Sequence, residues 1–235
     1  MRFILTALST ILLEVVYFVF YPLILVVLRL LRYQEAIQIQ GYNTEKSILI
    51  HAASLGEVNA AHNLILSLKD KFKNIAISTT TKTGKHQAEK YFPDVNVFIS
   101  PLDILHLRLK QLSAIRPQLI IIIETELWPQ LLLAAKIKSI PIVIANARIS
   151  DRSLRRYLRF HSLLQYISSS VKCVLAQSET DMAKFELLFA SDVYNAGNLK
   201  FSLTLQDYDS DLSRKNWGFS KDRKSTRLNS SHGKL

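Results

Sequence analysis

Apolar runs alternate with helical patterns from Ser47 onward, and this alternation constrains the fold more than any other feature of the chain. Seven short runs predict strands, at 48–50, 75–78, 95–99, 119–123, 140–145, 171–176 and 193–196. Helical periodicity fills the gaps, at roughly 59–72, 84–91, 104–115, 129–138, 153–168 and 179–189. The fourth run is apolar throughout, as a strand covered on both faces should be. The pattern predicts an α/β fold with a doubly wound parallel sheet.

The first predicted strand, Ile48–Ile50, runs into a short turn and then into a helical pattern. We expect Ser54 to cap that helix, Gly56 to allow a sharp turn of the backbone, and Glu57 to lie in the first helical turn. In open α/β sheets, ligands bind beyond the carboxyl ends of the strands, so Glu57 is placed at the mouth of a cleft. The same residues also fit a capping box that is closed by the glutamate, and this alternative stays open.

Three further polar loops follow predicted strands. They are Glu124–Pro129, Asn146–Ser153 and Ala176–Glu179. Because the carboxyl ends of parallel strands meet at one edge of a sheet, we expect these loops to share that edge with Glu57. For Glu124 and Glu126 the alternative is that they cap the next helix, with Trp128 as a packing residue. Four polar loops on one edge favour a functional site.

The formal charge of +11 suggests an anionic partner, but its distribution along the chain matters more. The segment from Arg214 to the end holds seven Lys or Arg and one Asp, which is +6 of the +11. This tail is polar and without periodicity, so we expect it not to fold. Residues 206–235 are similar to a vector-derived translation, and we exclude them from the domain. Nucleic-acid binding therefore loses much of its support.

Several classes of site lack their sequence signatures. Cys173 is the single cysteine, and the six histidines show no paired spacing of a zinc motif, so we expect no protein-bound metal. The chain has no Gly-x-Gly-x-x-Gly fingerprint and no phosphate-loop lysine motif. A nucleotide-dependent oxidoreductase is disfavoured for that reason, and we expect no cofactor.

Residues 3–31 form an apolar stretch with few polar interruptions. It exceeds the roughly 20 residues that cross a bilayer, and it lacks the cleavage pattern of a signal peptide. Arg29 and Arg32 lie at its end, whereas only Arg2 precedes it, so the positive-inside bias places the rest of the chain in the cytoplasm. We expect residues 1–32 to form a membrane-anchor helix that either spans the membrane or lies on it.

Five motifs carry a family resemblance. They are His51–Glu57, Thr79–Gly84, Glu124–Pro129, Asn146–Ser150 and Gly197–Phe201. In this order they resemble the bacterial 3-deoxy-D-manno-octulosonic acid (Kdo) transferases, inner-membrane enzymes of lipopolysaccharide core assembly, over about residues 1–205. The resemblance implies a GT-B glycosyltransferase, in which two Rossmann-like domains face each other across a cleft. The N-terminal domain would bind the lipid A precursor (lipid IVA) and the C-terminal domain the donor CMP-Kdo.

The resemblance also implies roles for individual residues. Glu57 matches the catalytic base, and Glu124 and Glu126 match an acidic pair on the acceptor side. Arg148 and Lys200 fall in matched motifs, with roles toward the substrate or the domain interface. Ser54 and Gly56 support the same site, and His51 is expected to be a satisfied histidine at the end of its strand.

In the family the donor-binding domain begins shortly after Phe201. We expect it to be absent here, so that residues 33–205 form the acceptor-binding domain of an enzyme that cannot turn over alone. The sequence leaves open whether this end is biological or a sequencing artefact, how many Kdo residues are added, and the oligomeric state. The alternative function is a membrane-attached module that binds glycolipid without catalysis.

Four arginines recur at helical spacing. Arg152, Arg155, Arg156 and Arg159 share one face of the helix predicted from Ser153. One hypothesis is that they contact anionic headgroups or the phosphates of the lipid A precursor, because the planar guanidinium donates two parallel hydrogen bonds to phosphate. The alternative is a solvated basic face.

Overall fold

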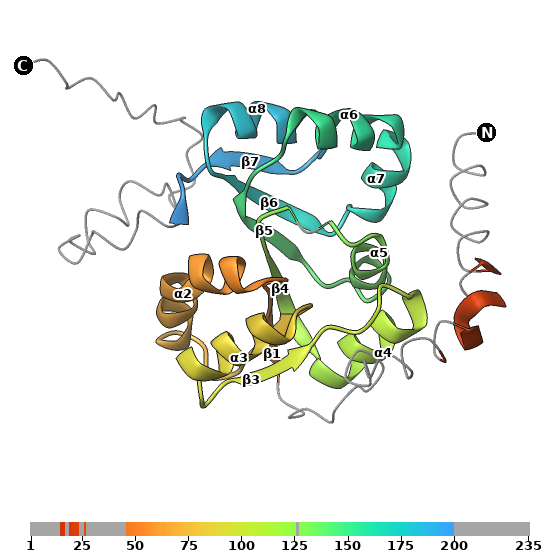
Figure 1. Cartoon of the computed structure of the whole chain (residues 1–235). Helices are drawn as coiled ribbons and strands as arrows, with labels where there is room; N and C mark the ends of the chain where they lie inside the picture. Colours follow the sequence, from red (N-terminus) through yellow and green to blue (C-terminus); the bar gives the residue numbers. More distant parts are fainter. Residues whose placement is uncertain (1–14, 17–18, 24–25, 27–45, 126, 200–235) are drawn as a thin grey trace, which may run out of the picture. The chain divides into compact units, whose positions relative to one another are not determined.

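The computed structural model describes residues 15, 16, 19–23, 26, 46–125 and 127–199 (Figure 1). The strands are β1 (Ser47–His51), β2 (Ile75–Thr79), β3 (Asn96–Ile99), β4 (Pro117–Ile123), β5 (Ile142–Ala147), β6 (Val171–Ala176) and β7 (Asp192–Asn195). They form one seven-stranded sheet in the order β3-β2-β1-β4-β5-β6-β7, and every neighbouring pair is parallel. The predicted parallel sheet is confirmed.

The helices between the strands are α2 (Leu55–Lys69), α3 (Lys82–Tyr91), α4 (Leu105–Ile115), α5 (Pro129–Ile137), α6 (Asp151–Arg159), α7 (His161–Ile167) and α8 (Glu179–Glu186). Most predicted bounds agree with the structure to within three residues, and two predictions differ by more. Helix α2 begins four residues earlier than expected, and the single helix expected over 153–168 is two helices. The break is at Phe160, where φ is −115° and ψ is 27°. It separates α6, which has no buried residue, from α7, which buries Leu164 and Ile167.

Two apolar clusters cover the two faces of the sheet. Successive side chains of a strand point to opposite faces, so Leu49 joins one cluster while Ile48 and Ile50 join the other. The cluster around Ile48 and Ile50 receives side chains from α2, and Ala88 of α3. The cluster around Leu49 receives side chains from α4, α5, α7 and α8. Helices therefore cover both faces, and the sheet is doubly wound. Figure 1 shows α2 and α3 side by side.

The role predicted for Gly56 is wrong. Gly56 is the second residue of α2 and has no positive φ; an added Cβ would meet only the Ser54 hydroxyl oxygen, at 3.8 Å. The close approach is at Gly84 in α3. A Cβ there would lie 2.9 Å from Thr81 Oγ1 and 3.2 Å from the carbonyl carbon of Ser54. Thr81 caps α3 by accepting the N–H of Gly84, so its side chain cannot move without losing that cap.

These two glycines form a matched pair for a stability measurement. Gly84→Ala is expected to lower the free energy of unfolding by about 1–3 kcal/mol, because the methyl group overpacks the start of α3 against Ser54. Gly56→Ala is expected to raise it by up to about 1 kcal/mol, because alanine favours a helix and has room there. Urea unfolding of both variants checks this; equal effects would contradict the packing described here.

Several predicted features lie outside the described residues, namely most of the membrane anchor (1–32), Glu126, Lys200 and the tail 206–235. Residues 15, 16, 19–23 and 26 are helical, and six apolar side chains among them are exposed: Val15, Val16, Val19, Phe20, Leu23 and Val26. Within the described part of the chain, no helix combines the length and apolarity that a membrane crossing requires.

Candidate functional site

The sheet reverses its winding between β1 and β4. From β1 the chain winds outward to β2 and β3, then returns to β4 and continues outward on the other side. Strands β1 and β4 pair directly, with His51 beside Ile122 at their carboxyl ends. In doubly wound folds a crevice forms at such a switch point, and ligands bind there. The predicted loops after β1, β4, β5 and β6 all lie at this carboxyl edge, as expected.

Glu57 lies at the switch point and is buried, with 7% of its surface exposed. Its carboxylate accepts the backbone N–H of Ala53 at 2.6 Å and the hydroxyl of Ser54 at 3.0 Å. Ser54 occupies the N-cap position of α2, but its side chain makes no cap hydrogen bond and donates to Glu57 instead. The arrangement is a variant of the capping box, in which the glutamate bonds one residue before the N-cap.

Glu124 follows β4 with a backbone φ of 60°, in the left-handed region that a glutamate rarely adopts. Its N–H donates to the carbonyl of Ala145 in β5, which holds the loop against the neighbouring strand. A carboxylate oxygen lies 3.9 Å from Arg148 Nη2, so the structure brings these two predicted residues together. Strained backbone of this kind is found at binding and catalytic sites, and it turns Glu124 toward the loop after β5.

An ion pair between buried Arg108 and partly buried Asp103 fixes the start of α5, which follows the loop that carries Glu124. Arg108 of α4 is 1% exposed, and its Nε donates to Asp103 at 3.0 Å. The two oxygens of Asp103 accept the N–H groups of Gln130 and Leu131, so this carboxylate caps α5. Burial lowers the pKa of Arg108, while the Asp103 carboxylate opposes that shift. Sequence reasoning missed this network, although Pro129 at the start of α5 did mark the position that needs a cap.

His51 ends β1 and is fully buried. Its Nδ1 lies 2.9 Å from Ser78 Oγ, and its ring meets Trp128 edge-on at a centroid distance of 6.3 Å. Its Nε2 has no hydrogen-bond partner among the described residues. The prediction that both ring nitrogens of His51 are hydrogen-bonded is therefore met at Nδ1 and not at Nε2. Burial, and then the Arg108 cation, lower the pKa of His51 from 6.5 to about 3. The ring of His51 is therefore neutral above about pH 3, and its described contacts are with Ser78 and Trp128.

The pKa of His51 predicts an acid dependence of stability. Between pH 6.5 and about 3, the unfolded chain binds a proton at His51 that the folded chain does not bind. The free energy of unfolding should therefore fall as the pH falls, by up to about 1.4 kcal/mol per pH unit from this residue. Urea unfolding at several pH values should show a shallower dependence for His51→Gln. An unchanged slope would contradict the buried, neutral histidine.

The four predicted arginines are exposed on α6, as a basic face requires. The start of α6 is fixed from α8, because Asp181 accepts the N–H of Ile149 and Lys184 pairs with Asp151 at 2.6 Å. Ser150 caps α6 by accepting the N–H of Ser153. Only one of the four arginines, Arg156, lines a hollow at the carboxyl edge.

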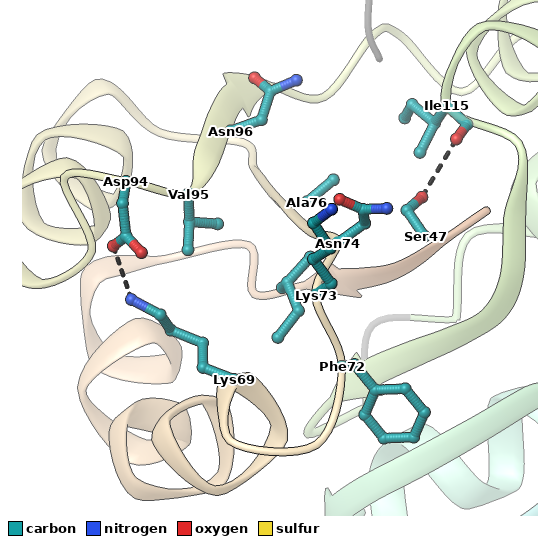
Figure 2. A pocket seen from close by; sticks show the side chains of 11 residues that line it. Ser47, Lys69, Phe72, Lys73, Asn74, Ala76, Asp94, Val95, Asn96 and Ile115 are labelled. Atoms are coloured by element: carbon teal, nitrogen blue, oxygen red, sulfur yellow. Dashed lines mark hydrogen bonds and ion pairs between the residues drawn. The ribbon is translucent and has the colours of Figure 1, made fainter. Parts of the chain in front are cut away.

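Two hollows lie at opposite edges of the sheet. One, of about 270 Å³, lies at the amino ends of β1, β2 and β3, where Lys69 and Asp94 pair across its rim (Figure 2). The other, of about 440 Å³, lies between the loop after β4 and the start of α6, and Trp128, Arg148 and Arg156 line it. The second hollow adjoins the predicted site, whereas the first contains none of the predicted residues.

Comparison with known proteins identifies a family match. Residues 29–203 match the model of the family described as 3-deoxy-D-manno-octulosonic-acid transferase. The chain is 35% identical over 167 residues to the 3-deoxy-D-manno-octulosonic acid transferase of Haemophilus influenzae, covering 69% of this chain and 39% of that protein. It is 37% identical over 179 residues to a bifunctional glycosyltransferase/methyltransferase of Fusobacterium nucleatum, covering 74% of this chain and 28% of that protein.

The chain thus spans between 28% and 39% of the length of these curated relatives. Among solved structures, it is similar to one described as a UDP-N-acetylglucosamine 2-epimerase from Listeria monocytogenes. The TM-score is 0.50 at 11% identity, covering 74% of this chain and 52% of that one. At this identity the similarity concerns the fold alone.

Proposed function

The chain belongs to the 3-deoxy-D-manno-octulosonic-acid (Kdo) transferase family, and from this membership we propose that it forms the acceptor-binding part of a glycosyltransferase. The complete enzyme, of GT-B architecture, would move Kdo from CMP-Kdo to a lipid A precursor in lipopolysaccharide biosynthesis. The observation that carries this proposal is the buried carboxylate of Glu57, held by Ala53 and Ser54 at the switch point of the sheet.

The chemistry of the transfer requires such a group. A sugar hydroxyl is a poor nucleophile at neutral pH, and a positioned carboxylate that takes its proton raises the rate. We assign this role to Glu57. The bonds from Ala53 and Ser54 fix the direction of its carboxylate, and orientation of the reacting groups supplies a large part of such catalysis. Glu124 and Arg148, on the loops beside it, would position the acceptor.

The same geometry supports a second candidate, a glycolipid-binding module without catalysis. The bonds that orient Glu57 also tie the first turn of α2 to Ala53 and Ser54, so its burial has a structural explanation as well. Both candidates bind a lipid A precursor, but only the first transfers Kdo.

A chimera separates the two candidates. The segment of this chain that aligns with the Haemophilus influenzae relative replaces the matching segment of that protein. Transfer of labelled Kdo from CMP-Kdo to lipid IVA by the chimera supports the enzyme. A folded chimera that binds lipid IVA but transfers no Kdo supports the binding module.

We also propose that residues 1–32 attach the domain to the cytoplasmic face of the inner membrane. The six exposed apolar side chains between Val15 and Val26 support this, because a bilayer would cover them. The chain is expected to sediment with membranes and to need detergent, whereas a version that starts at Tyr33 should stay largely in the supernatant. Ultracentrifugation of both forms checks this; a full chain that stays in solution without detergent would contradict the attachment.

A further inference from the structure

The 440 Å³ hollow at the carboxyl edge has two kinds of lining. Arg148 and Arg156 supply two cations, and no Asp or Glu is among the described residues that line it. Five of the ten lining residues are apolar or aromatic, namely Leu127, Trp128, Pro129, Ile149 and Tyr157. Small-molecule sites commonly combine such walls with a few polar groups that set the orientation of the ligand.

The two guanidinium groups are weakly engaged by the described protein. Arg148 is 66% exposed and reaches Glu124 only at 3.9 Å, while Arg156 donates to Ser153 Oγ at 3.4 Å. Each guanidinium carries five N–H donors in a planar fork, which matches the oxygens of a phosphate. The hollow thus presents donors from two elements, the loop after β5 and α6, toward one space.

Two buried polar atoms on the same lining also lack partners. Thr125 Oγ1 and Trp128 Nε1 are inaccessible to solvent and make no hydrogen bond within the described residues. Both residues line the hollow. Buried donors and acceptors are nearly always paired in folded proteins, so these two atoms are exceptions on the lining of the hollow. Because solvent does not reach them, a ligand in the hollow would pair with them only after the two side chains move.

We propose that this hollow binds a phosphate monoester carried on a sugar ring. Arg148 and Arg156 would hold the phosphate, and the Trp128 and Tyr157 side would cover the less polar face of the ring. This deepens the proposed function and rests on it, since the phosphosugar would be the head of the acceptor. Of the four arginines of α6, Arg156 lines the sugar-phosphate site, and Arg152, Arg155 and Arg159 do not.

Trp128 gives the site its own optical signal. The chain has two tryptophans, Trp128 and Trp217. In Trp217→Phe, Trp128 is therefore the one remaining tryptophan, and the tryptophan fluorescence reports on it. This variant of the full chain, in detergent micelles, is titrated with glucosamine 6-phosphate, glucosamine and inorganic phosphate. The expected result is a saturable change with glucosamine 6-phosphate, at least about tenfold weaker binding of inorganic phosphate, and no saturation with glucosamine.

Three further substitutions in this background locate the binding. Arg148→Gln and Arg156→Gln should each weaken glucosamine 6-phosphate binding by about tenfold or more, because each removes charge-assisted hydrogen bonds. Lys138→Gln removes one exposed charge at the opposite edge of the sheet and should change binding less than twofold. Equal losses in all three variants, or none in Arg156→Gln, would overturn the site. Equal affinity for inorganic phosphate would overturn the sugar component.

The outcome is separable from that of the proposed function. Absence of glucosamine 6-phosphate binding in a chain whose chimera transfers Kdo would reject this site and leave the glycosyltransferase standing. Saturable binding that depends on Arg156, in a chain whose folded chimera transfers no Kdo, would support the site and reject the glycosyltransferase.

Discussion

Glu57→Gln in the chimera is expected to lower the rate of Kdo transfer by about a hundredfold or more, the usual scale for loss of a general base. Glutamine has nearly the same shape, and its amide oxygen can still accept the N–H of Ala53. The substitution therefore removes the proton acceptor while it retains the contact that caps α2. The readout is the turnover rate at saturating lipid IVA and CMP-Kdo.

Two controls separate catalysis from capping. Ser54→Ala removes the hydroxyl that donates to Glu57 but leaves the carboxylate, so the rate should fall far less than in Glu57→Gln. The urea midpoints of wild type and Glu57→Gln should be similar, because the cap persists. Near-normal transfer by a folded Glu57→Gln variant would reject the base. If the rate falls only in proportion to the amount of folded protein, the role of Glu57 is structural and not catalytic.

Asp103→Ala is expected to cause the largest loss of stability, about 3–5 kcal/mol in the free energy of unfolding. The substitution leaves the buried Arg108 guanidinium without its carboxylate partner, and a buried charge without compensation is costly. It also removes the acceptor for the first N–H groups of α5, those of Gln130 and Leu131. Urea unfolding of the wild type and the variant measures the loss.

An exposed ion pair provides the matched control. Asp94 pairs with Lys69 in solvent, with 66% of its side chain exposed, and Asp94→Ala should leave the free energy of unfolding nearly unchanged. Arg108→Met together with Asp103→Ala should be less destabilising than Asp103→Ala alone, because the uncompensated charge is gone. A double variant as unstable as the sum of the single variants would contradict the coupling between these residues.

The sheet could be predicted because each strand is a local pattern. Runs such as Leu119–Ile123 are apolar at every position, short and rich in isoleucine, as a strand buried on both faces should be. The shared edge followed from parallel topology alone. It is enough to place Ser54, Glu57, Glu124 and Arg148 at one edge of the sheet.

The contacts that orient these residues could not be predicted in the same way. Asp103 meets the start of α5 across 27 residues of sequence, and Asp181 meets Ile149 across 32. Such pairs depend on how the helices pack, and no local periodicity encodes them. The break at Phe160 was missed because the pattern through α6 and α7 remains helical on both sides of it.

The role of Gly56 was misjudged for a related reason. A glycine after a strand commonly marks a turn, but this one lies inside a helix with room for a side chain. The position that has no room for a side chain is Gly84. The atoms that crowd it include the backbone of Ser54, which lies 30 positions earlier in the sequence.

Hydrogen exchange of the full chain, with and without a lipid A precursor, tests most directly whether the acceptor binds at the carboxyl edge. The account predicts slower exchange in segments 52–58, 127–131 and 148–157, and no change around the hollow of Figure 2, at 69–76 and 94–96. Protection confined to 69–76 and 94–96, with the carboxyl edge unchanged, would contradict it.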